Sequence, residues 1–220
     1  MSIEPDIANP DSLPEREACP DFFESENLPR PIDWADFFGV DAPVEVEVGC
    51  GNGRYLRRAA EERPGHLFFG IERSLSYARK ARDRMVKYDI GNACIVKGDA
   101  TQILADHIAD GSVHTLHVYF TDPWPKKRHG KRRLFQTPFI ETCHRILRPG
   151  GQIFIKVDLF WYFEEIAGRF ENSPHFRVIE TATETDPNRD LYDITGFEHK
   201  ALVKKGAVYL ITALNEGEQA

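Results

Sequence analysis

Long apolar segments are missing from this 220-residue sequence, which has no run near the roughly 18 apolar residues of a membrane-spanning helix. Its first residues, Met-Ser-Ile-Glu-Pro-Asp, lack the basic start and apolar stretch of a secretory signal. The four cysteines lie 31, 44 and 49 positions apart, which fits neither a zinc knuckle nor a small disulfide framework, and the eight histidines form no metal-binding pattern. We therefore expect a cytoplasmic protein that binds no membrane and no metal. The sequence does not distinguish a monomer from a homodimer.

Positive charge is also scarce overall, because 28 Lys and Arg face 35 Asp and Glu and give a net charge of −7. Taken alone, this balance argues against a nucleic-acid partner. Residues 126–133 depart from it, with six Lys or Arg in eight positions (Lys-Lys-Arg-His-Gly-Lys-Arg-Arg). This basic cluster is therefore a candidate contact for an anionic partner.

The N-terminal part of the sequence is rich in proline, and residues 1–43 contain seven of the fourteen prolines. Proline fixes φ and removes a backbone donor, so this stretch cannot be regular helix or central strand throughout. We predict a partly disordered N-terminal arm over residues 1–43. Trp34, Phe37 and Phe38 are expected to dock onto a single domain that covers residues 44–220.

From residue 44 onward, short apolar runs alternate with stretches of helical pattern, which is typical of repeated βαβ units. The fold class that follows is α/β: a doubly wound, mostly parallel sheet with helices on both faces. Thr137 before Pro138 predicts a helix N-cap with proline at the first helical position, and residues 149–151 (Pro-Gly-Gly) predict a sharp stop before the next strand. Strands are expected at 44–48, 66–71, 93–97, 113–120, 152–157 and 207–210, and helices at 54–62, 75–88, 138–147 and 160–170.

Each of five successive predicted strands has a carboxylate residue at or just after its carboxyl end. In an open parallel sheet these ends lie along one edge, where such folds bind ligands. Each acid alone could be a helix N-cap or a solvated strand end, but five on one edge favour a ligand with positive charge and hydroxyl groups, such as S-adenosylmethionine. By position, Glu72 is expected near the ribose hydroxyls and Asp99 near the adenine. The five acids are Glu47, Glu72, Asp99, Asp122 and Asp158.

The first predicted strand runs into a glycine loop, Glu47-Val-Gly-Cys-Gly-Asn-Gly53. Its glycines, Gly49, Gly51 and Gly53, let the backbone turn tightly and approach a ligand. A dinucleotide enzyme would need Gly-x-Gly-x-x-Gly, but the sixth position here is Arg54, and Glu47 would repel a pyrophosphate. The loop therefore favours a cationic cofactor over NAD.

The basic cluster follows directly on Asp122-Pro-Trp-Pro at the end of a predicted strand. A solvated surface loop is the plain alternative. Three features favour RNA instead: the cluster begins at the predicted ligand edge, two prolines stiffen it, and it combines an acid, an aromatic ring and six cations. Phosphate contacts supply affinity and base-edge contacts supply specificity. Trp124 either stacks on a base or anchors the loop, and we favour anchoring.

The segment from Asp122 to His129 (Asp-Pro-Trp-Pro-Lys-Lys-Arg-His), with Lys-Arg-Arg at 131–133, resembles the tRNA (guanine-N7-)-methyltransferase family of class I S-adenosylmethionine-dependent methyltransferases. The order and spacing of the motifs match over about residues 44–210. Gly196 departs from the family, which usually has a longer, often basic side chain there, and residues 200–205 lack its glycine-histidine pair. The other shared motifs are the glycine loop, residues 70–72 (Gly-Ile-Glu), 98–100 (Gly-Asp-Ala), 156–158 (Lys-Val-Asp) and 195–198 (Thr-Gly-Phe-Glu).

The resemblance implies a Rossmann-like fold, S-adenosylmethionine as cofactor, and methylation of N7 of guanosine 46 in the variable loop of tRNA. It gives Asp122 a catalytic role as well as a share in cofactor binding. The cofactor-binding residues are then Glu47, Gly49, Gly51, Gly53, Glu72, Asp99 and Asp122. The substrate-binding residues are Lys126, Asp158, Thr195, Gly196, Phe197 and Glu198, to which the basic cluster adds Arg128, Lys131, Arg132 and Arg133.

Guanine N7 carries a free lone pair, so an enzyme of this kind needs no base and mainly positions N7 in line with the methyl group. A carboxylate near N1–H and the amino group would stabilise the positive charge that appears on the purine, and Asp122 is the candidate. Two alternatives stay open: a methyltransferase for a small molecule or another RNA, and a non-catalytic RNA-binding module. The basic cluster counts against a small molecule, and the five acids count against a pure binder.

Overall fold

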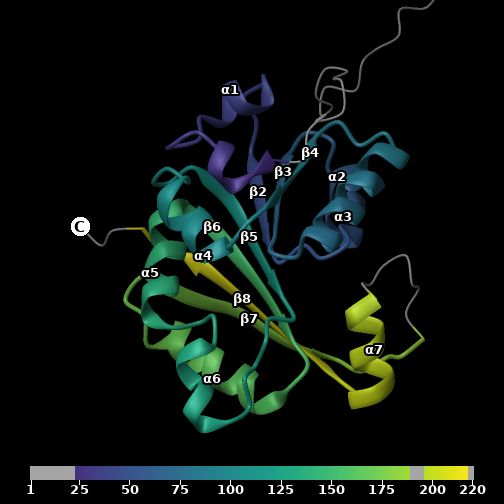
Figure 1. The fold of residues 1–220 in the computed structure, drawn as a ribbon. Coiled ribbons are helices and arrows are strands. Elements are labelled where there is room, and N and C mark those ends of the chain that lie inside the picture. The colour runs from purple at the N-terminus through teal and green to yellow at the C-terminus, as the bar shows by residue number, and fades with distance from the viewer. Residues whose placement is uncertain (1–22, 189–195, 218–220) are drawn as a thin grey trace, which may run out of the picture.

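The structure is a computed structural model that describes residues 23–188 and 196–217, which form an eight-stranded sheet flanked by helices (Figure 1). The strand order is β1-β4-β3-β2-β5-β6-β8-β7. The strands are β1 (Phe23–Glu24), β2 (Val44–Val48), β3 (Leu67–Glu72), β4 (Ala93–Lys97), β5 (Val113–Tyr119), β6 (Leu147–Val157), β7 (Phe176–Glu184) and β8 (Val208–Asn215). The α-helices are α1 (Trp34–Phe38), α2 (Arg54–Glu62), α3 (Leu75–Lys87), α4 (Ala100–Asp106), α5 (Thr137–Ile146), α6 (Phe160–Glu171) and α7 (Gly196–Lys205).

Six strands of the sheet pair in parallel, and their carboxyl ends share one edge. Parallel pairing runs without a break from β1 through β4, β3, β2 and β5 to β6. β8 runs antiparallel to both β6 and β7, so its first residues, and α7 before them, lie at the edge where the parallel strands end. This edge faces downward in Figure 1. The expected α/β class, a doubly wound and mostly parallel sheet, is confirmed.

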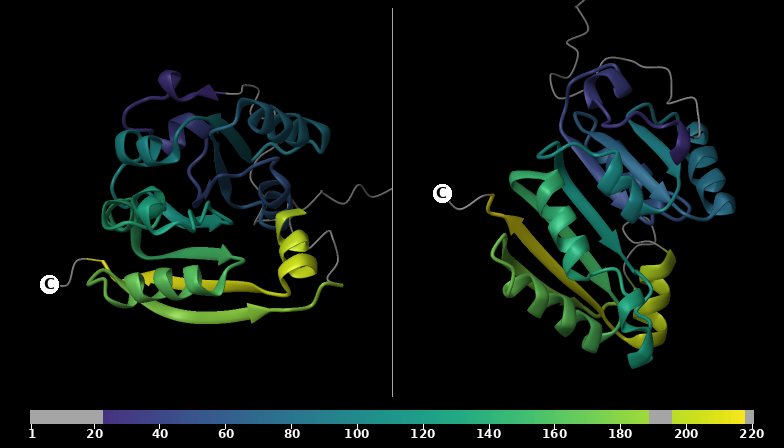
Figure 2. Two further views of the ribbon diagram at one scale, coloured as in Figure 1. Left: turned by 60° about the horizontal axis from the view of Figure 1, so that its bottom comes forward. Right: turned by 60° about the vertical axis from the view of Figure 1, so that its left-hand side comes forward.

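Helices cover both faces of the sheet (Figure 2). Successive strand residues point to opposite faces: Val44, Val46 and Val48 join the larger core with residues of α1, α4, α5 and α6. On the other face α2 and α3 pack against β3 and β4 around Leu56 and Phe68. No helix in the described ranges is long and apolar enough to span a membrane.

Residues 23–43, which we assigned to the N-terminal arm, pack onto the domain. Trp34 and Phe38 are buried, and the Trp34 ring lies 5.2 Å from the Phe69 ring of β3, centroid to centroid. Phe37 lies 5.9 Å from the same ring, and Trp34 Nε1 donates to Ser112 Oγ at 3.1 Å. The expected docking of the three aromatic residues is confirmed. These aromatic residues are buried although the segment is rich in proline, so the packed domain begins at residue 23 or earlier and not at residue 44. Residues 1–22 of the predicted arm lie outside the described residues.

Two local predictions at helix ends were wrong. Gln136 rather than Thr137 occupies the N-cap position of α5, so Thr137 is the first helical residue and the proline follows it within the first turn. β6 begins at Leu147, directly after α5. Residues 149–151 therefore lie inside that strand, where the pairing with β5 changes register, and they do not precede it as a stop.

Both edges of the sheet are short or irregular. β1 covers the edge of β4 with two residues only, and Lys97 Nζ of β4 lies 3.3 Å from a carboxylate oxygen of Glu24. At the opposite edge, the pairing of β7 with β8 shifts register between Val178 and Glu180. Neither edge is therefore a long, regular row of open backbone groups.

Candidate active site at the carboxyl edge

The loop between β2 and α2 has a left-handed backbone at all three of its glycines. φ is +72° at Gly49, +56° at Gly51 and +71° at Gly53, which side chains other than hydrogen rarely allow. At Gly53 a Cβ would also lie 3.0 Å from the Ala81 Cβ of α3, too close for normal contact. At Gly49 and Gly51 no atom of the described residues lies within 4 Å of the Cβ position, so this side of the loop presents bare backbone to a ligand.

Two contacts that the sequence did not reveal hold the glycine loop in place. Glu72, at the end of β3, accepts hydrogen bonds from Gly51 N at 2.9 Å and from Ser74 N at 2.7 Å. Arg84 of α3 donates from Nη1 to the carbonyl oxygen and to Oδ1 of Asn52, at 2.6 and 3.0 Å. A loop fixed before a ligand arrives loses less conformational entropy on binding. Glu72 thus supports the loop in addition to its predicted contact with a ribose.

Glu47, at the end of β2, is a buried acid without a hydrogen-bonding partner for one oxygen. Its residue is 4% exposed, and Oε2 has no hydrogen-bond partner within the described part of the chain. Burial, reinforced by the charge of Glu72, raises the pKa of Glu47 to about 8, and Arg58 offsets only part of this rise. A buried polar atom left unpaired costs free energy. A ligand that brings a cation or a hydrogen-bond donor to Oε2 would recover that cost.

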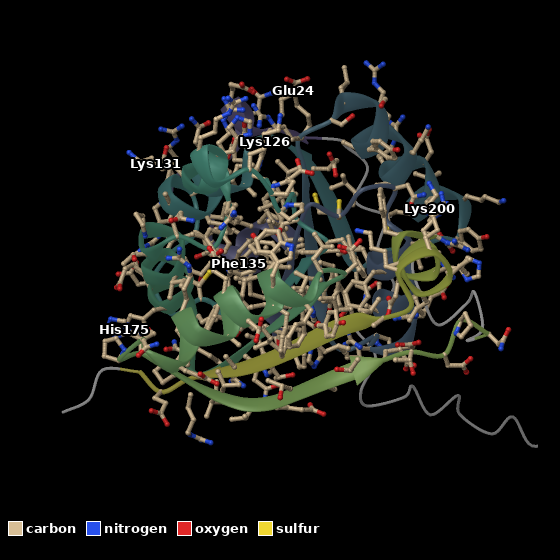
Figure 3. All side chains as sticks on the ribbon, turned by 90° about the horizontal axis from the view of Figure 1, so that it is seen from below. Glu24, Lys126, Lys131, Phe135, His175 and Lys200 are labelled. Carbon is tan, nitrogen blue, oxygen red and sulfur yellow. The ribbon has the colours of Figure 1, made fainter. Side chains whose placement is uncertain are left out.

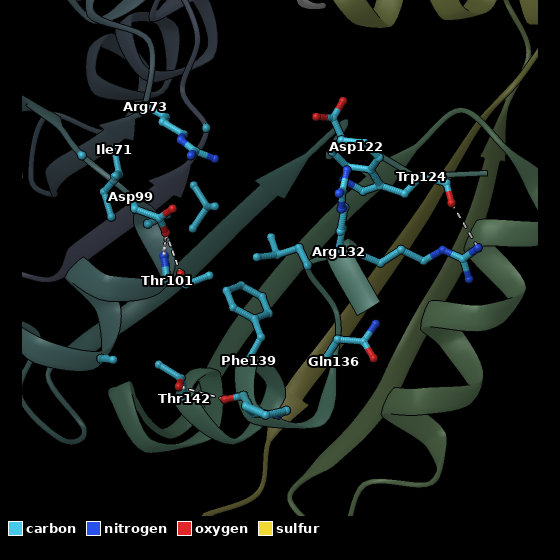
Figure 4. Close-up of a pocket in the computed structure, with 18 of the residues that line it drawn as sticks. Ile71, Arg73, Asp99, Thr101, Asp122, Trp124, Arg132, Gln136, Phe139 and Thr142 are labelled. Carbon is cyan, nitrogen blue, oxygen red and sulfur yellow. Dashed lines mark hydrogen bonds between the residues drawn. The ribbon is translucent and has the colours of Figure 1, made fainter. Parts of the chain in front are cut away.

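Two cavities open beside the glycine loop and meet at Gly49 and Glu72. The first, of about 730 Å³, has Asp99 and Arg73 on one side and Asp122, Trp124 and Arg132 on the other (Figure 4). The second, of about 610 Å³, lies between the glycine loop, α3 and α7. Its wall includes Glu47, Arg54, Tyr55, Tyr77, Tyr119, Phe197 and Lys200.

Four of the five expected acids line these cavities. They are Glu47, Glu72, Asp99 and Asp122. Asp99 also caps α4, accepting hydrogen bonds from Thr101 N at 3.0 Å and Thr101 Oγ1 at 2.6 Å, so the alternative of a helix cap holds for it as well. Asp158 lines neither cavity and pairs with Lys205 Nζ of α7 at 2.7 Å. The structure gives Asp158 an ion-pair partner, and its predicted contact with the substrate stays a prediction.

The backbone after β5 has an unusual shape that Arg133 holds. Phe120 and Trp124 have φ of +54° and +44°, values that are uncommon for residues with a side chain. Arg133 donates from Nε to the Pro123 carbonyl at 3.0 Å and from Nη2 to the Trp124 carbonyl at 3.3 Å. Its guanidinium also pairs with Glu165 of α6. Arg133 therefore shapes the loop beside the first cavity, and its predicted phosphate contact stays a prediction.

Trp124 packs within the loop, which supports the anchoring role. The Arg132 guanidinium lies 5.0 Å from the centroid of the Trp124 ring, and His129 packs edge-on against that ring at 5.8 Å. The cluster lies on the 3-10 helix from Lys127 to Arg132 and just before it, and four of its cations are exposed. Lys126 and Lys131 lie on one side of the molecule and Lys200 of α7 on the other (Figure 3). The exposed cations of the basic cluster are Lys126, Arg128, Lys131 and Arg132.

Three residues of the predicted motif at 195–198, Gly196 to Glu198, lie at the start of α7 and have two different roles. Gly196 and Phe197 line the second cavity, and Phe197 is 61% exposed. Glu198 is buried and pairs with Lys156 Nζ of β6 at 2.8 Å, so it fastens α7 to the sheet. Its predicted contact with the substrate stays a prediction. Thr195 lies outside the described residues.

A buried polar network beside the second cavity was missed by the sequence analysis. Glu45, on the same face of β2 as Glu47, accepts hydrogen bonds from Arg63 Nε at 2.8 Å and from His117 Nε2 at 2.7 Å. Burial alone would raise the pKa of Glu45, but His117 and Arg63 outweigh it and lower the pKa to about 2. Tyr55 Oη lies 3.1 Å from His117 Nδ1 and links the network to the cavity wall. The sequence does carry a sign of this network: the pattern Val-Glu-Val-Glu-Val places acids in a strand that is buried along its whole length, and a buried acid needs polar partners.

The two cavities fit a cationic nucleoside such as S-adenosylmethionine. The unpaired Oε2 of Glu47 suits an ammonium group, and Glu72 at the junction of the cavities suits hydroxyl groups. Ile71 and Phe139 give the first cavity apolar surface for a base. Within the described residues no group of three His, Cys, Asp or Glu side chains is placed to hold a metal ion.

Comparison with known proteins agrees with this arrangement. A family model described as "Putative methyltransferase" matches residues 41–211. The chain is 38% identical to a tRNA (guanine-N(7)-)-methyltransferase of Rhodopirellula baltica, over 80% of this chain and 67% of the relative. It is 35% identical to a protein of the same name from Thermotoga maritima, over 86% of this chain and 59% of the relative. The chain thus spans about two thirds or less of the length of these curated relatives.

Among solved structures, a 16S rRNA methyltransferase superposes on the chain with a TM-score of 0.62. The match covers 88% of this chain and 98% of the other, at 14% sequence identity. Sequence identity this low shows a shared fold and nothing about the substrate.

Proposed function

The chain belongs to the tRNA (guanine-N(7)-)-methyltransferase family, and from this premise we propose that it transfers a methyl group from S-adenosylmethionine to N7 of guanosine 46 in the variable loop of tRNA. The product is 7-methylguanosine. The single observation that supports this most directly is the placement of opposite charges around two cavities that meet at the glycine loop. Glu47, a buried acid with one unpaired oxygen in the described chain, lines the second cavity, and exposed cations stand beyond Asp122 on the wall of the first.

The acids of the first half of the chain would hold the cofactor. Glu47 would accept hydrogen bonds from the α-ammonium group, Glu72 would accept them from the ribose hydroxyls, and Asp99 would lie near the adenine. The bare backbone of Gly49 and Gly51 lets the cofactor approach without a steric barrier. When bound, S-adenosylmethionine supplies the electrophilic methyl group and a positive charge that these carboxylates balance.

The second half of the chain would hold the guanosine. N7 has its lone pair free, so the residues around it need only fix its position and stabilise the charge that develops on the ring. Asp122 stands exposed at the wall of the first cavity, where its carboxylate can accept hydrogen bonds from N1–H and the amino group of guanine. Lys126, Lys131 and Arg132 would contact phosphates. Arg133 supports this wall through its contacts to the Pro123 and Trp124 carbonyls.

The test is nucleoside mass spectrometry of unmodified tRNA after incubation with the protein and S-adenosylmethionine. We expect 7-methylguanosine in a transcript that carries guanosine 46 and none in a matched transcript with adenosine at that position. Product in both transcripts would place the reaction at another guanosine. A lack of 7-methylguanosine in either would overturn the proposed reaction.

The same reagents separate the two alternatives. A non-catalytic RNA-binding module would bind tRNA and show no heat of binding with S-adenosylmethionine in calorimetry. A small-molecule methyltransferase would bind the cofactor but not tRNA. A cytoplasmic location and the choice between monomer and homodimer stay predictions from the sequence.

A further inference from the structure

The surface of α3 carries a concentration of positive charge that the proposed reaction has not used. Residues 73–88 contain six Lys or Arg and one Asp, a formal charge of +5 in a chain whose net charge is −7. The helices on the opposite face lack this excess, because α4, α5 and α6 carry formal charges of −1, 0 and −2. The charge on α3 is therefore local to this helix and its approaches.

Nearby acids do not neutralise this surface. Asp83 pairs with Arg82 at 2.9 Å, and Glu61 of α2 pairs with Arg57 of the same helix. Among the described residues no ion pair involves Lys80 or Lys87, and both side chains are exposed. Like charges left unpaired on one helix destabilise it, so a stability role does not account for them.

The cations are arranged as a stripe that begins at the second cavity. Tyr77 lines that cavity, and Lys80, one turn further on, has Nζ 5.3 Å from the centroid of the Tyr77 ring. Residues three, seven, ten and eleven positions beyond Tyr77 fall on one side of a helix. Arg84, Lys87 and Tyr88 take these further places, and Lys87 Nζ lies 5.4 Å from the centroid of the Tyr88 ring. From Tyr77 to Tyr88 the stripe spans about 16.5 Å along the axis, at 1.5 Å per residue.

The stripe and the basic cluster lie on two sides of the same pair of cavities. α2 and α3 stand beside each other above α7, away from α5 and α6 (Figure 1). The side chain of Arg54 of α2 extends toward α7. Its Nη1 lies 3.6 Å from the point that a Cβ would occupy at Gly196. The basic cluster borders the first cavity through Lys131 and Arg132. A polyanion laid across the cavities would therefore meet cations at both ends.

We propose that the α3 stripe, defined by Lys80, Arg84 and Lys87 with Tyr77 and Tyr88, is a second contact surface for the sugar–phosphate backbone of the substrate RNA. The inference rests on the proposed function, because it takes the RNA to be the tRNA whose guanosine enters the cavities. Cations interleaved with exposed aromatic rings suit a nucleic-acid strand, in which phosphates and stacked bases alternate. The basic cluster then fixes the strand on one side of the methylated base and the stripe fixes it on the other.

The test reverses the charge of the two cations of the stripe that touch neither cavity wall nor glycine loop, in the double variant Lys80→Glu/Lys87→Glu. Its control is Arg148→Glu/Arg177→Glu, which makes the same change in net charge at exposed positions near the amino ends of β6 and β7. Fluorescence anisotropy gives the tRNA dissociation constant at several salt concentrations, and calorimetry gives the affinity for S-adenosylmethionine. A second variant, Lys80→Ala/Lys87→Ala, guards against misfolding caused by the new acids.

We expect the stripe variant to bind tRNA at least tenfold more weakly than wild type near 100 mM salt. The slope of log affinity against log salt should fall by about 2, roughly one for each phosphate that the variant no longer neutralises. Cofactor affinity and the rate at saturating tRNA should stay within twofold of wild type, and the control should bind tRNA as wild type does. The alanine variant should show a smaller decrease in affinity in the same direction.

Tight tRNA binding by both stripe variants, within twofold of wild type, would overturn the proposal. So would an equal decrease in the Arg148/Arg177 control, since only net charge would then matter. If the stripe variants kept tRNA affinity but no longer bound phosphatidylserine vesicles, the surface would be a lipid contact and not an RNA contact. Failure of the proposed reaction looks different: wild type would bind tRNA and form no 7-methylguanosine, and the binding comparison would still decide the role of the stripe.

Discussion

Replacing Glu47 with Gln probes the buried carboxylate beside the glycine loop. Glu47 is buried, its Oε2 is unpaired in the described chain, and its pKa is raised from 4.5 to about 8. An unfolded chain loses this proton near pH 4.5, whereas the folded protein keeps it until about pH 8. Between these values the folded state binds more protons than the unfolded state. The free energy of unfolding therefore falls as the pH rises through this range.

The size of this decrease follows from the two pKa values. One pH unit corresponds to about 1.4 kcal/mol for a single group, so the interval from 4.5 to about 8 corresponds to roughly 5 kcal/mol. Gln cannot ionise, so the Glu47→Gln protein should escape the decrease. Relative to wild type, the variant should gain about 1.4 kcal/mol of stability for each pH unit between 5 and 7.5. This gain is a difference between two proteins, so other groups that titrate in both cancel from it.

Urea denaturation of both proteins at pH 5 to 8.5, without ligand, measures this difference. A repeat with saturating S-adenosylmethionine should narrow the difference in stability between the two proteins, because the proposed ammonium group beside Glu47 would stabilise the ionised carboxylate only in wild type. The variant should also bind the cofactor at least tenfold more weakly at pH 8. If the two stability curves ran parallel between pH 5 and 8, Glu47 would already be ionised in the free protein, and the reasoning from its burial would be refuted.

Three further substitutions test separate parts of the structure. Asp122→Asn should lower the rate of 7-methylguanosine formation by about 10²–10³ while the midpoint of urea denaturation stays unchanged, and a rate within fivefold of wild type would overturn the proposed catalytic role of Asp122. Trp34→Ala should lower the free energy of unfolding by about 3–5 kcal/mol in urea denaturation, because the Trp34 ring is buried against β3. A decrease below 1 kcal/mol would show that residues 23–43 fold separately from the domain. Gly53→Ala should abolish cofactor binding in calorimetry, because the new Cβ would meet Ala81 at 3.0 Å, whereas the control Gly150→Ala, with φ of +77° and open space, should keep it.

The central strands and their helices could be predicted closely from the sequence. The bounds of β2, β4 and α2 agree with the expected 44–48, 93–97 and 54–62, because buried parallel strands and amphipathic helices leave strong patterns. β7, α4 and α7 were not predicted. Most side chains of β7 are exposed, so the strand lacks an apolar signal, and its place comes from pairing with β8. α4 has only seven residues, which is too short for a clear helical period.

The site divides in a similar way, between residues whose role is local and residues whose role depends on a distant partner. The glycine loop and the acids at the strand ends were found because the carboxyl ends of parallel strands share one edge of the sheet, whatever the order of the strands. Arg133 and Glu198 were assigned to the substrate, yet each is engaged with a partner 32 or 42 positions away, Glu165 or Lys156. Spacing along the chain carries no sign of such a partner. A cation in a basic cluster therefore looks the same in the sequence whether it faces solvent or pairs with a carboxylate from another helix.

The form of the two sheet edges bears on self-association. An open strand edge offers unpaired N–H and C=O groups to another chain, and a long, flat one invites aggregation. Here β4 is shielded by the two residues of β1 and by the charges of Glu24 and Lys97, and the pairing of β7 is broken by a register shift beside Glu180. Growth of the sheet by strand addition from a second copy is thus disfavoured at both ends. If the protein forms a homodimer, the copies should meet through helices and loops, and the eight-stranded sheet should stay confined to one chain.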